Sequence, residues 1–503
     1  MEKKYILVID EGTTSVRSVI FDRQMQIVGE ARRNTTTFYP EKHAVEQDAG
    51  EIYERTVETM QEVVRTTGIN AWEIAAIGIT TQRATWTFWN RETGEPIRKS
   101  IVWADTRACY NKAKLLADPE FVAKFPDADD QLFYTEQHHP IILKYIQEHE
   151  EGLTEELGKE TTIAGTVDTW LLYKFTGGKV HATSLSEASM TMFYTFRRND
   201  WDYEFVRWSG LNDSAMAEIR PDMYHYGDLI PDVLGVQIPI VCMIADQHAA
   251  LFSQGCLNPG QGKGTMGTGF FFDVNIGKEP VFIRGYKTAF CWEIGDDRPY
   301  IFEGTLPIAG AALEWMKNKL RLIDNFSEMD TSAQSVEDSG GIYFIPALVA
   351  LCNAPFYDSS MEGCFIGITA DNDRRHFLRA IVEGVAFLST HVLLDTLQYT
   401  GSLSELRISG GVARSDLICQ IMANVSGVNI VRGKDSEATA KGAAEISGLY
   451  LEWLKWDEVE GYYHVDRVFK PNGDAEKDKG HYAWWKKALG RVAHWNDPLE
   501  LNP

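Results

Sequence analysis

Short apolar runs separated by polar turns dominate the first part of the chain and predict a beginning rich in β-structure. Residues 5–10, 17–22 and 26–32 have the composition of three strands joined by tight turns. Residues 51–68 carry apolar side chains close to helical spacing, which predicts an amphipathic helix. The apolar run 74–80 then predicts a buried strand, and the polar residues TQRAT follow at its carboxyl end.

The second half of the chain repeats this order of elements. A polar Gly/Thr turn leads into an apolar strand within 262–277, a long helix is predicted over 376–398, and a strand ending in a Gly-Gly turn is predicted within 405–416. The repetition predicts an α/β protein made of two related domains, each opening with a β-hairpin phosphate loop. We place the domains at 1–250 and 251–503, with a ligand cleft between them.

The last predicted element is a helix in the C-terminal region 461–503. It carries the sequence HYAWWKKALGRVAHW, and we expect its Trp residues to pack on the second domain. No run approaches the roughly 18 apolar residues that a membrane-spanning helix needs, and the apolar N-terminal run is too short for a signal peptide. The sequence therefore predicts a protein that does not cross a membrane.

Composition narrows the partners and the compartment. The 503 residues include 72 acidic and 49 basic side chains, a net charge of -23, which disfavours nucleic acid and anionic membranes as partners. The seven cysteines are odd in number and widely spaced, and no CxxC occurs. This pattern predicts reduced thiols in a cytoplasmic protein, without a zinc site or a disulfide framework.

The first hairpin has an unusual tip, in which two carboxylates precede a glycine and two hydroxyls. The residues are Asp10, Glu11, Gly12, Thr13 and Thr14. Backbone N–H groups and hydroxyls with little side-chain bulk are suitable donors to phosphate oxygens, and Asp10 could hold Mg²⁺ through water. An ordinary hairpin with a solvated acid is the alternative.

A second tip and an isolated acid strengthen the phosphate interpretation. Gly267, Thr268 and Gly269 form another small polar turn, although the chain has neither a Walker motif nor a GxGxxG opening a helix. Asp246 and Gln247 follow a buried apolar strand, where the acid could act as a general base for a hydroxyl or simply cap a helix.

Taken together, these stretches resemble the FGGY family of carbohydrate kinases, and within it the glycerol kinases most. The matching segments occur in the family's order over nearly the whole chain: DEGTTSVRSVIFD, IGITTQRAT, IVWADTR, GTVDTWLLYKFTGG, ADQHAALFSQGC, GTMGTGFF, GCFIGITADNDRRHFLRAIVEGVAF and ISGGVARSD. The resemblance implies two actin-like (ribonuclease H-like) ATPase domains around a cleft. It also implies transfer of the γ-phosphate of Mg-ATP to a primary hydroxyl of a polyol or sugar.

The resemblance also implies roles for individual residues. Asp246 would be the general base, and Asp10, together with Asp246, would place Mg²⁺. The residues that would contact the nucleotide and its phosphates are Gly12, Thr13, Thr14, Arg17, Thr268, Gly310, Glu314, Gly411 and Ser415. Glu314 and Ser415 stand where glycerol kinases tend to carry Gln and Asn, so we expect an altered nucleotide affinity.

The acceptor pocket implied by the resemblance is only partly matched. Its expected members are Arg83, Ala84, Trp103, Gln137, His138, Asp246, Gln247 and Phe271. Ala84 replaces the Glu of glycerol kinases, and the family's pocket Tyr is aligned with Gln137, next to His138 and His139. Two adjacent histidines on a strand would point to opposite faces, so one metal bound by both is not expected.

Two interpretations of these departures remain open. Glycerol stays the acceptor if a nearby acid, Glu136 or Asp105, replaces the missing Glu. Otherwise the acceptor is a four- to six-carbon polyol or ketose, because the loss of a hydroxyl partner relaxes selectivity. An actin-like ATPase without a small-molecule acceptor is a third hypothesis. The family implies a homo-oligomer, a dimer or a tetramer.

Overall fold

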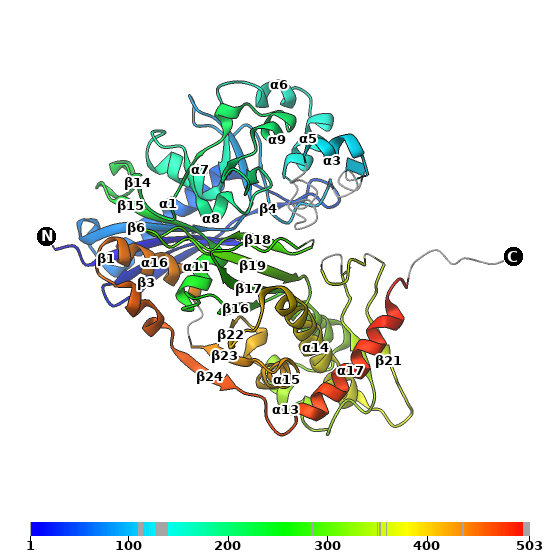
Figure 1. Ribbon diagram of the computed structural model, residues 1–503. Coiled ribbons are helices and arrows are strands. Elements are labelled where there is room, and N and C mark those ends of the chain that lie inside the picture. Colours follow the sequence, from blue (N-terminus) through cyan, green and yellow to red (C-terminus); the bar gives the residue numbers. More distant parts are fainter. Residues whose placement is uncertain are drawn as a thin grey trace. The chain divides into compact units, whose positions relative to one another are not determined.

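The computed structural model describes residues 2–108, 114–115, 117–125, 139–283, 285–349, 351, 354–358, 360–434 and 437–495 (Figure 1). The chain divides into two compact units. The first comprises Met1–Gly255, Ala289–Tyr300 and Glu437–Tyr462, and the second comprises Cys256–Thr288, Ile301–Ser436 and Tyr463–Pro503. Two late segments thus join the N-terminal unit, whereas the domain limits 1–250 and 251–503 stay a prediction.

The first unit is built on a six-stranded sheet with the order β14-β15-β6-β1-β2-β3. Strands β1 and β2 form an antiparallel hairpin, and β6 and β15 continue the sheet parallel to β1. The strands are β1 (Tyr5–Glu11), β2 (Ser15–Asp22), β3 (Ile27–Asn34), β6 (Ile74–Thr81), β14 (Met223–Asp228) and β15 (Pro239–Ala245). The predicted three-strand opening and the buried strand after it are confirmed.

Smaller sheets and helices complete this unit. A five-stranded sheet contains β4 (Thr37–Phe38), β5 (Glu46–Gln47), β7 (Trp86–Asn90), β8 (Ser100–Ile101) and β9 (Thr162–Thr166), and two pairs are β10 (Ala182–Ser184) with β13 (Glu218–Arg220) and β11 (Tyr194–Thr195) with β12 (Asp200–Trp201). The helices are α1 (Ala49–Thr67), α3 (Pro119–Lys124), α5 (His139–His149), α6 (Leu153–Leu157), α7 (Val167–Phe175), α8 (Leu185–Ala188), α9 (Tyr203–Trp208), α10 (Pro231–Leu234), α11 (Asp246–Ser253) and α16 (Ala438–Tyr450).

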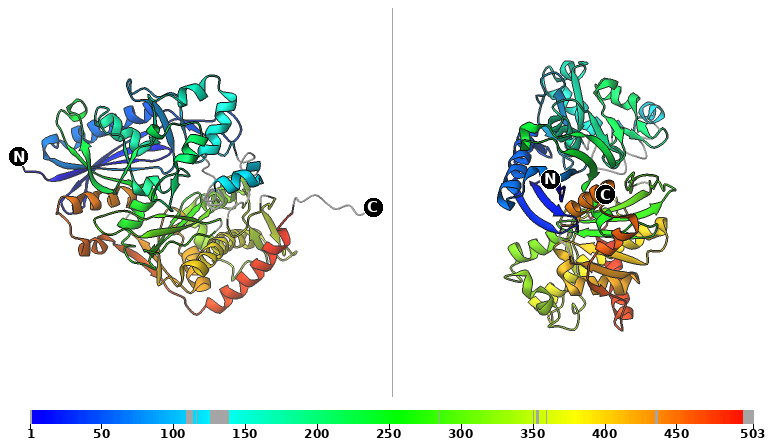
Figure 2. Two further views of the ribbon diagram at one scale, coloured as in Figure 1. Left: turned by 45° about the horizontal axis from the view of Figure 1, so that its top comes forward. Right: turned by 90° about the vertical axis from the view of Figure 1, so that its left-hand side faces the viewer.

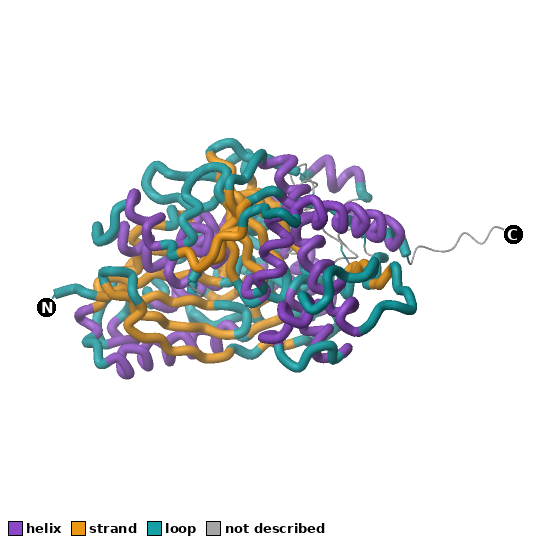
Figure 3. The backbone as a smooth tube through the Cα atoms, turned by 90° about the horizontal axis from the view of Figure 1, so that it is seen from below, coloured by secondary structure: helices purple, strands orange, loops and turns teal. Residues whose placement is uncertain are grey.

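The second unit repeats the topology of the first, as the sequence predicted. Its seven-stranded sheet has the order β18-β19-β17-β16-β22-β23-β24, with β16 and β17 antiparallel and β22 and β23 parallel to β16. Its elements are β16 (Gly262–Met266), β17 (Phe270–Gly277), β18 (Lys287–Phe290), β19 (Tyr300–Leu306), β20 (Tyr343–Ile345), β21 (Cys364–Ile366), β22 (Glu405–Ser409), β23 (Asn429–Gly433), β24 (Val465–Phe469), α12 (Gly310–Trp315), α13 (Met329–Ala333), α14 (Arg374–Thr400), α15 (Asp416–Ser426) and α17 (Ala475–Val492). The boundary between the units passes through β18 after Thr288 and through β19 after Tyr300. Figure 3 distinguishes the helices from the strands by colour.

Helix α1 illustrates how local sequence sets an element. The Asp48 side chain accepts hydrogen bonds from the N–H groups of Gly50 (2.9 Å) and Glu51 (3.2 Å), which caps the helix start. Gly68 ends the helix in a left-handed conformation, φ +69°. One face carries buried residues such as Ile52, and the predicted helix is confirmed to within two residues at each end.

Helix α16 joins the first unit because glycines let it pack very closely. A Cβ on Gly442 would lie 2.0 Å from the carbonyl oxygen of Ala249 in α11, and a Cβ on Gly78 of β6 would lie 2.7 Å from the Ser447 hydroxyl of α16. Since no side chain fits at either point, the two backbones approach one another directly. This contact depends on residues far apart in sequence, which explains why the sequence pattern did not reveal it.

Helix α14 is the core helix of the second unit. Among the described residues it is the one helix long and apolar enough to cross a membrane, with a mean hydropathy of 1.6 over its best 18 residues, although the prediction excluded such a run. Of that window, 83% is buried inside the protein, so its length and composition are weak evidence for a membrane span. Its apolar residues instead form the centre of the unit's hydrophobic core.

Helix α17 packs beside α14 in the second unit, near the C-terminus (Figure 2). Trp485 is fully buried, and its indole N–H donates to the carbonyl of Phe344 (2.9 Å). Trp484 and Trp495 are 57% and 65% exposed. The expectation that the Trp residues pack on the domain is therefore correct for Trp485 and wrong for the other two. Trp484 is the neighbour of Trp485 on the helix and faces a different direction, whereas Trp495 lies beyond the end of α17 at Val492.

Two further sequence predictions were tested by the described residues. Five cysteines are unbridged, namely Cys242, Cys256, Cys291, Cys364 and Cys419, while Cys109 and Cys352 lie outside the described residues. His139 begins helix α5 and is buried, so the strand geometry assumed for the two adjacent histidines does not hold for it.

Candidate active site

The tip of the first hairpin is closed by a short turn at the end of the β1–β2 pair. The Gly12 N–H donates to the Ser15 carbonyl (3.0 Å), and Asp10 lies directly opposite Arg17 in the strand register. Arg17 forms ion pairs with both Asp10 and Glu437. A cation predicted to contact phosphate is thus held by two carboxylates, one of them contributed by the start of α16.

The two carboxylates at the tip have different surroundings. Asp10 is 7% exposed, and burial raises its pKa in spite of the opposing Arg17 charge. Glu11 is fully buried and accepts hydrogen bonds from the Gln82 amide (3.1 and 3.2 Å). Burial raises the pKa of Glu11 well above its usual range, and the charges of Asp10 and Asp246 add to that effect. Both acids feel the charge of Asp246, but the carboxylate of Glu11 is bonded to Gln82, whereas that of Asp10 is paired with Arg17.

Thr13 connects the hairpin tip to a residue expected in the acceptor pocket. Its hydroxyl accepts a hydrogen bond from the indole N–H of Trp103 (2.8 Å), and its carbonyl accepts one from the Gln47 amide (2.6 Å). The neighbouring Thr14 carbonyl accepts from the N–H of Thr35 (3.1 Å). The structure thus brings together Thr13 and Trp103, which are 90 residues apart in sequence.

Arg83 and Asp246 meet because their strands are neighbours. Strands β6 and β15 run parallel with Thr81 opposite Ala245, so the residues after each strand emerge at the same edge of the sheet. The Arg83 guanidinium forms an ion pair with Asp246 Oδ1 at 3.4 Å, and the side chains are 7% and 27% exposed. Asp246 therefore retains contact with solvent beside a nearly buried cation.

Asp246 is the first residue of α11, and Ala245 occupies the capping position without a side-chain bond. The alternative in which Asp246 caps a helix is therefore wrong. Its Oδ1 accepts the N–H of Gln247 at 2.6 Å, which fixes the carboxylate at the start of the helix. A buried strand thus delivers a partly exposed carboxylate whose orientation is set by the backbone.

Ala84 is fully buried and has φ +55°, the left-handed region that side chains rarely adopt. Asp105, one of two acids considered as a substitute for the missing Glu, is also fully buried. Its oxygens accept from the N–H of Val45 (2.8 Å) and pair with Arg107. Asp105 is thus not a free carboxylate for a ligand. Glu136, Gln137 and His138 lie outside the described residues.

Glu187 is a buried acid that the sequence interpretation missed. It is fully buried in α8, and its Oε1 accepts from the Thr81 hydroxyl (2.9 Å) at the end of β6. Burial raises its pKa well above the usual range, and Asp246 and Arg83 contribute to its electrostatics. The preceding residue, Ser186, accepts the N–H of Ala245 (3.0 Å). No local motif marks α8, because its role depends on two strands distant in sequence.

The second hairpin tip lies in the second unit and packs against the start of α12. The Thr268 carbonyl accepts from the N–H groups of Ala309 (2.8 Å) and Ala311 (3.1 Å), and the Gly267 carbonyl accepts from Gly310 (2.9 Å). The Thr268 side chain is exposed. A Cβ on Gly310 would lie 2.4 Å from the Gly267 oxygen, so only glycine permits this approach.

The other predicted nucleotide contacts also lie in the second unit. Gly411 is exposed, with nothing within 4 Å of its added Cβ, so the backbone faces open space. Glu314 is exposed on α12 and accepts from the Asn318 amide (2.7 Å). Ser415 caps α15 by accepting from Ile418 (3.1 Å) and donates to Asp330 (2.5 Å). Phe271, which was expected in the acceptor pocket and not at the nucleotide, is half-buried on β17 of the same unit.

A divalent cation fits the first tip only with help from other ligands. No cluster of three or more His, Cys, Asp or Glu side chains suited to a metal occurs in the part of the chain that the structure describes. Asp10 and Asp246 are nevertheless close enough for their charges to interact, because the charge of Asp246 contributes to the raised pKa of Asp10. Mg²⁺ is typically bound by one or two carboxylates plus phosphate oxygens and water, which matches this donor set.

Comparison with known proteins places the whole chain in one family. Residues 5–253 match the N-terminal domain, and residues 262–449 the C-terminal domain, of the FGGY family of carbohydrate kinases. The glycerol kinase of Symbiobacterium thermophilum is 36% identical over 98% of this chain and 99% of its own, and that of Carboxydothermus hydrogenoformans is 37% identical with the same coverage.

Solved structures agree on the fold. A crystal structure of Plasmodium falciparum glycerol kinase with ADP superposes with a TM-score of 0.89 at 27% identity, covering 98% of this chain and 99% of that one. A ligand-bound xylulose kinase from Lactobacillus acidophilus gives 0.85 at 18% identity over 97% and 98%, which shows the fold alone. The expected actin-like α/β fold is confirmed, and the chain belongs to the FGGY family of carbohydrate kinases.

Proposed function

We propose that this enzyme transfers the γ-phosphoryl group of ATP to a primary hydroxyl of a small polyol, and that glycerol is the acceptor. The observation that carries the proposal is the full-length similarity, at 36–37% identity, to proteins described as glycerol kinases. The Arg83–Asp246 pair and the Trp103–Thr13 contact support it, because they place a carboxylate, a guanidinium and an aromatic ring within one unit.

Asp246 is proposed as the general base that accepts the proton of the acceptor hydroxyl. Its partial exposure makes it reachable, and the Gln247 N–H bond and the Arg83 ion pair orient it. Arg83 is proposed to hold neighbouring hydroxyls through its forked donors, because a planar guanidinium can bond two oxygens at once. Trp103 would cover the carbon chain, with its indole N–H already directed to Thr13.

ATP and Mg²⁺ are the proposed cosubstrate and cofactor. Asp10, with Asp246, would hold the cation, which neutralises charge on the transferring phosphoryl group when bound. Gly12, Thr13, Thr14 and Arg17 in the first unit, and Thr268 in the second, are proposed phosphate contacts. Gly310, Glu314, Gly411 and Ser415 are proposed nucleotide contacts; Ser415 has the weakest support, because its hydroxyl already caps α15.

A four- to six-carbon polyol or ketose is the second candidate acceptor, favoured by one observation. Ala84 offers no polar group, and the carboxylate of Asp105 is bound by Arg107, so neither residue replaces the missing acid. The first unit therefore supplies fewer hydroxyl acceptors than a dedicated glycerol site would need. Gln137 and His138, outside the described residues, stay predicted substrate contacts.

The test is ADP release measured against glycerol, erythritol, xylitol, erythrulose and xylulose, with the wild type and Asp246→Asn. The proposal expects turnover that depends on an added acceptor and a fall of about 10²–10⁴-fold in kcat for Asp246→Asn. Asp228→Asn, at an exposed position of β14, is the matched control. Efficient use of glycerol identifies the acceptor, whereas preference for a longer compound selects the second candidate. ATP hydrolysis that ignores every acceptor would support an ATPase of another class.

We further propose that the enzyme acts in the cytoplasm as a homo-oligomer, a dimer or a tetramer, and that it binds neither nucleic acid nor membrane. The net charge of -23 supports the last two points, since polyanions repel one another.

A further inference from the structure

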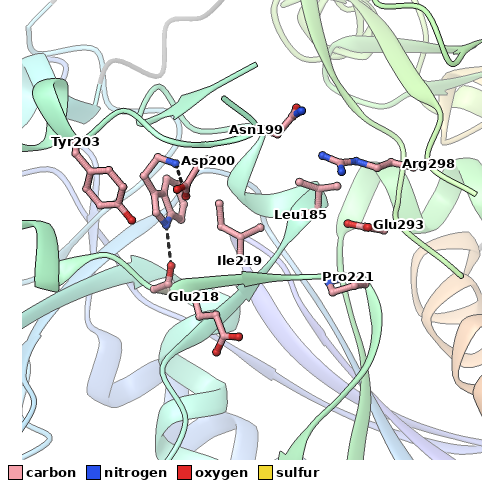
Figure 4. A pocket seen from close by; sticks show the side chains of 11 residues that line it. Leu185, Asn199, Asp200, Tyr203, Glu218, Ile219, Pro221, Glu293 and Arg298 are labelled. Atoms are coloured by element: carbon pink, nitrogen blue, oxygen red, sulfur yellow. Dashed lines mark hydrogen bonds between the residues drawn. The ribbon is translucent and has the colours of Figure 1, made fainter. Parts of the chain in front are cut away.

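A pocket in the first unit is lined by residues other than those proposed for catalysis. It has a volume of about 480 Å³, within the usual range for small-ligand sites. Its walls come from the β11–β12 turn, α8, α9, β13 and the segment 289–300, and Figure 4 shows the side chains that line it. No role in phosphoryl transfer has been given to any of these side chains.

Arg298 provides one side of this pocket, and its guanidinium is fixed in place. The guanidinium carbon lies 4.1 Å from the centre of the Phe290 ring, and the group also interacts with the Tyr194 hydroxyl. The buried Nε has no hydrogen-bond partner, and Arg298 forms no ion pair with any carboxylate of the described residues. The pocket thus contains an oriented cation whose charge the protein itself does not neutralise.

Glu293 provides an uncompensated negative charge beside it (Figure 4). Its backbone N–H donates to Asp222 Oδ2 (2.8 Å), which fixes its position, whereas its carboxylate has no hydrogen bond or ion pair within the described ranges. Another acid of the lining, Glu218, is already paired with Arg220 (2.6 Å). A free cation and a free carboxylate therefore face the same space without neutralising each other.

Asn199 adds a second donor near Arg298. Its Oδ1 accepts from the Tyr194 hydroxyl (3.3 Å), so the amide nitrogen of Asn199 takes no part in that bond and can donate to a ligand. On the other side, Leu185, Ile219 and Pro221 form an apolar wall (Figure 4). Of the other two carboxylates in the lining, Glu218 is paired with Arg220, and Asp200 accepts from the N–H of Trp201 (2.7 Å). The pocket thus presents two donors, the unpaired carboxylate of Glu293 and an apolar surface.

We propose that this pocket binds a small α-amino acid. Its carboxylate would be bound by Arg298 and Asn199, its ammonium by Glu293, and its side chain by the apolar wall. A zwitterion neutralises both unpaired charges at once, which a neutral polyol cannot do. A phosphorylated ligand fits poorly, because Asp200, Glu218 and Glu293 place three carboxylates in the lining against one guanidinium.

The test is isothermal titration calorimetry on the full-length protein with L-alanine, L-leucine and L-methionine. Two analogues of leucine separate its charges: 4-methylpentanoic acid lacks the ammonium, and isopentylamine lacks the carboxylate. We expect saturable binding of at least one amino acid and binding at least about tenfold weaker for each leucine analogue, since a charge-assisted bond is lost.

Variants locate the binding. Arg298→Gln and Glu293→Gln are expected to weaken it about tenfold or more, whereas Arg207→Gln and Glu204→Gln, exposed on α9, leave it unchanged. Asn199→Asp, at an exposed position, is the second route should Arg298→Gln fail to fold, and it opposes the ligand carboxylate directly. The proposal is overturned if no amino acid binds, if either analogue binds as tightly as leucine, or if binding survives Arg298→Gln or Asn199→Asp.

Discussion

Replacing Gly310 with Ala tests whether the second hairpin tip and α12 form one rigid nucleotide-binding element. The added methyl group would lie 2.4 Å from the Gly267 oxygen and 3.1 Å from a methyl carbon of Val412, well inside ordinary contact distances. The Gly267 carbonyl must therefore move by about 0.6–1 Å, because real Cβ atoms essentially never lie closer than 3.0 Å to such an atom and mostly lie beyond 3.4 Å. That shift breaks the Gly310–Gly267 hydrogen bond of 2.9 Å.

The expected result is a large loss of function with a modest loss of stability. Overpacking of this kind costs about 1–3 kcal/mol in unfolding free energy, and a displacement near 1 Å can cost about 100-fold in rate. The assay is kcat/KM for ATP at saturating acceptor, with the melting temperature measured in parallel. Gly480→Ala, in an open position of α17, is the matched control. It should leave kcat/KM unchanged and should not lower the melting temperature, because Ala favours a helix over Gly by about 1 kcal/mol.

Gly411→Ala distinguishes a direct effect on nucleotide binding from an effect on the stability of the protein. Its methyl group meets nothing within 4 Å, so it should leave stability intact and change the KM for ATP only if the nucleotide itself passes close by. A folded Gly310→Ala enzyme with the wild-type KM for ATP would refute the view that the Gly267–Gly310 contact shapes the nucleotide site.

Three further predictions concern the first unit. Burial raises the pKa of Asp222 from 3.8 to about 7, so its folded form keeps a proton that the unfolded chain releases, and stability should fall between about pH 4 and 7, by up to about 4 kcal/mol. In Asp222→Asn, the urea concentration at the unfolding midpoint should change less with pH across that window than it does in the wild type. An equal pH dependence in the two proteins would contradict the raised pKa of Asp222. Trp103→Phe removes the 2.8 Å bond to Thr13 and should lower kcat/KM for the acceptor about fivefold, with unchanged values arguing that the contact is incidental. Glu187→Gln keeps an oxygen that can accept the hydrogen bond of the Thr81 hydroxyl and removes the titrating carboxyl group, so activity at neutral pH should persist. Glu187→Leu loses that hydrogen bond and should raise the KM for the polyol.

Much of the fold could be predicted because its elements are encoded locally. The strand–turn–strand openings, helix α1 with its Asp48 cap and Gly68 stop, and the repeated order in the second unit all follow from short-range patterns. The N-cap hypothesis for Asp246 and the strand geometry assumed for His139 failed at element boundaries, where one residue changes the assignment.

The candidate site was only partly predictable, because residue types can be read from a sequence but their partners cannot. Arg83 and Asp246 stood out as polar residues after buried strands, and their ion pair followed from parallel neighbours. Nothing local indicated that Glu437 would pair with Arg17 or that Glu187 would hold Thr81. Those contacts join segments separated by 420 and 106 residues.

The sequence by itself determined the class of protein, the two glycine-rich hairpin tips and the residues whose chemistry suits phosphoryl transfer. Only the tertiary structure decided which acids are engaged and which are free: Glu11 bonds Gln82, Asp105 is bound by Arg107, and Glu293 has no partner among the described residues. The physical reason is that the state of a carboxylate depends on burial and on neighbouring charges, which chain folding brings from distant positions.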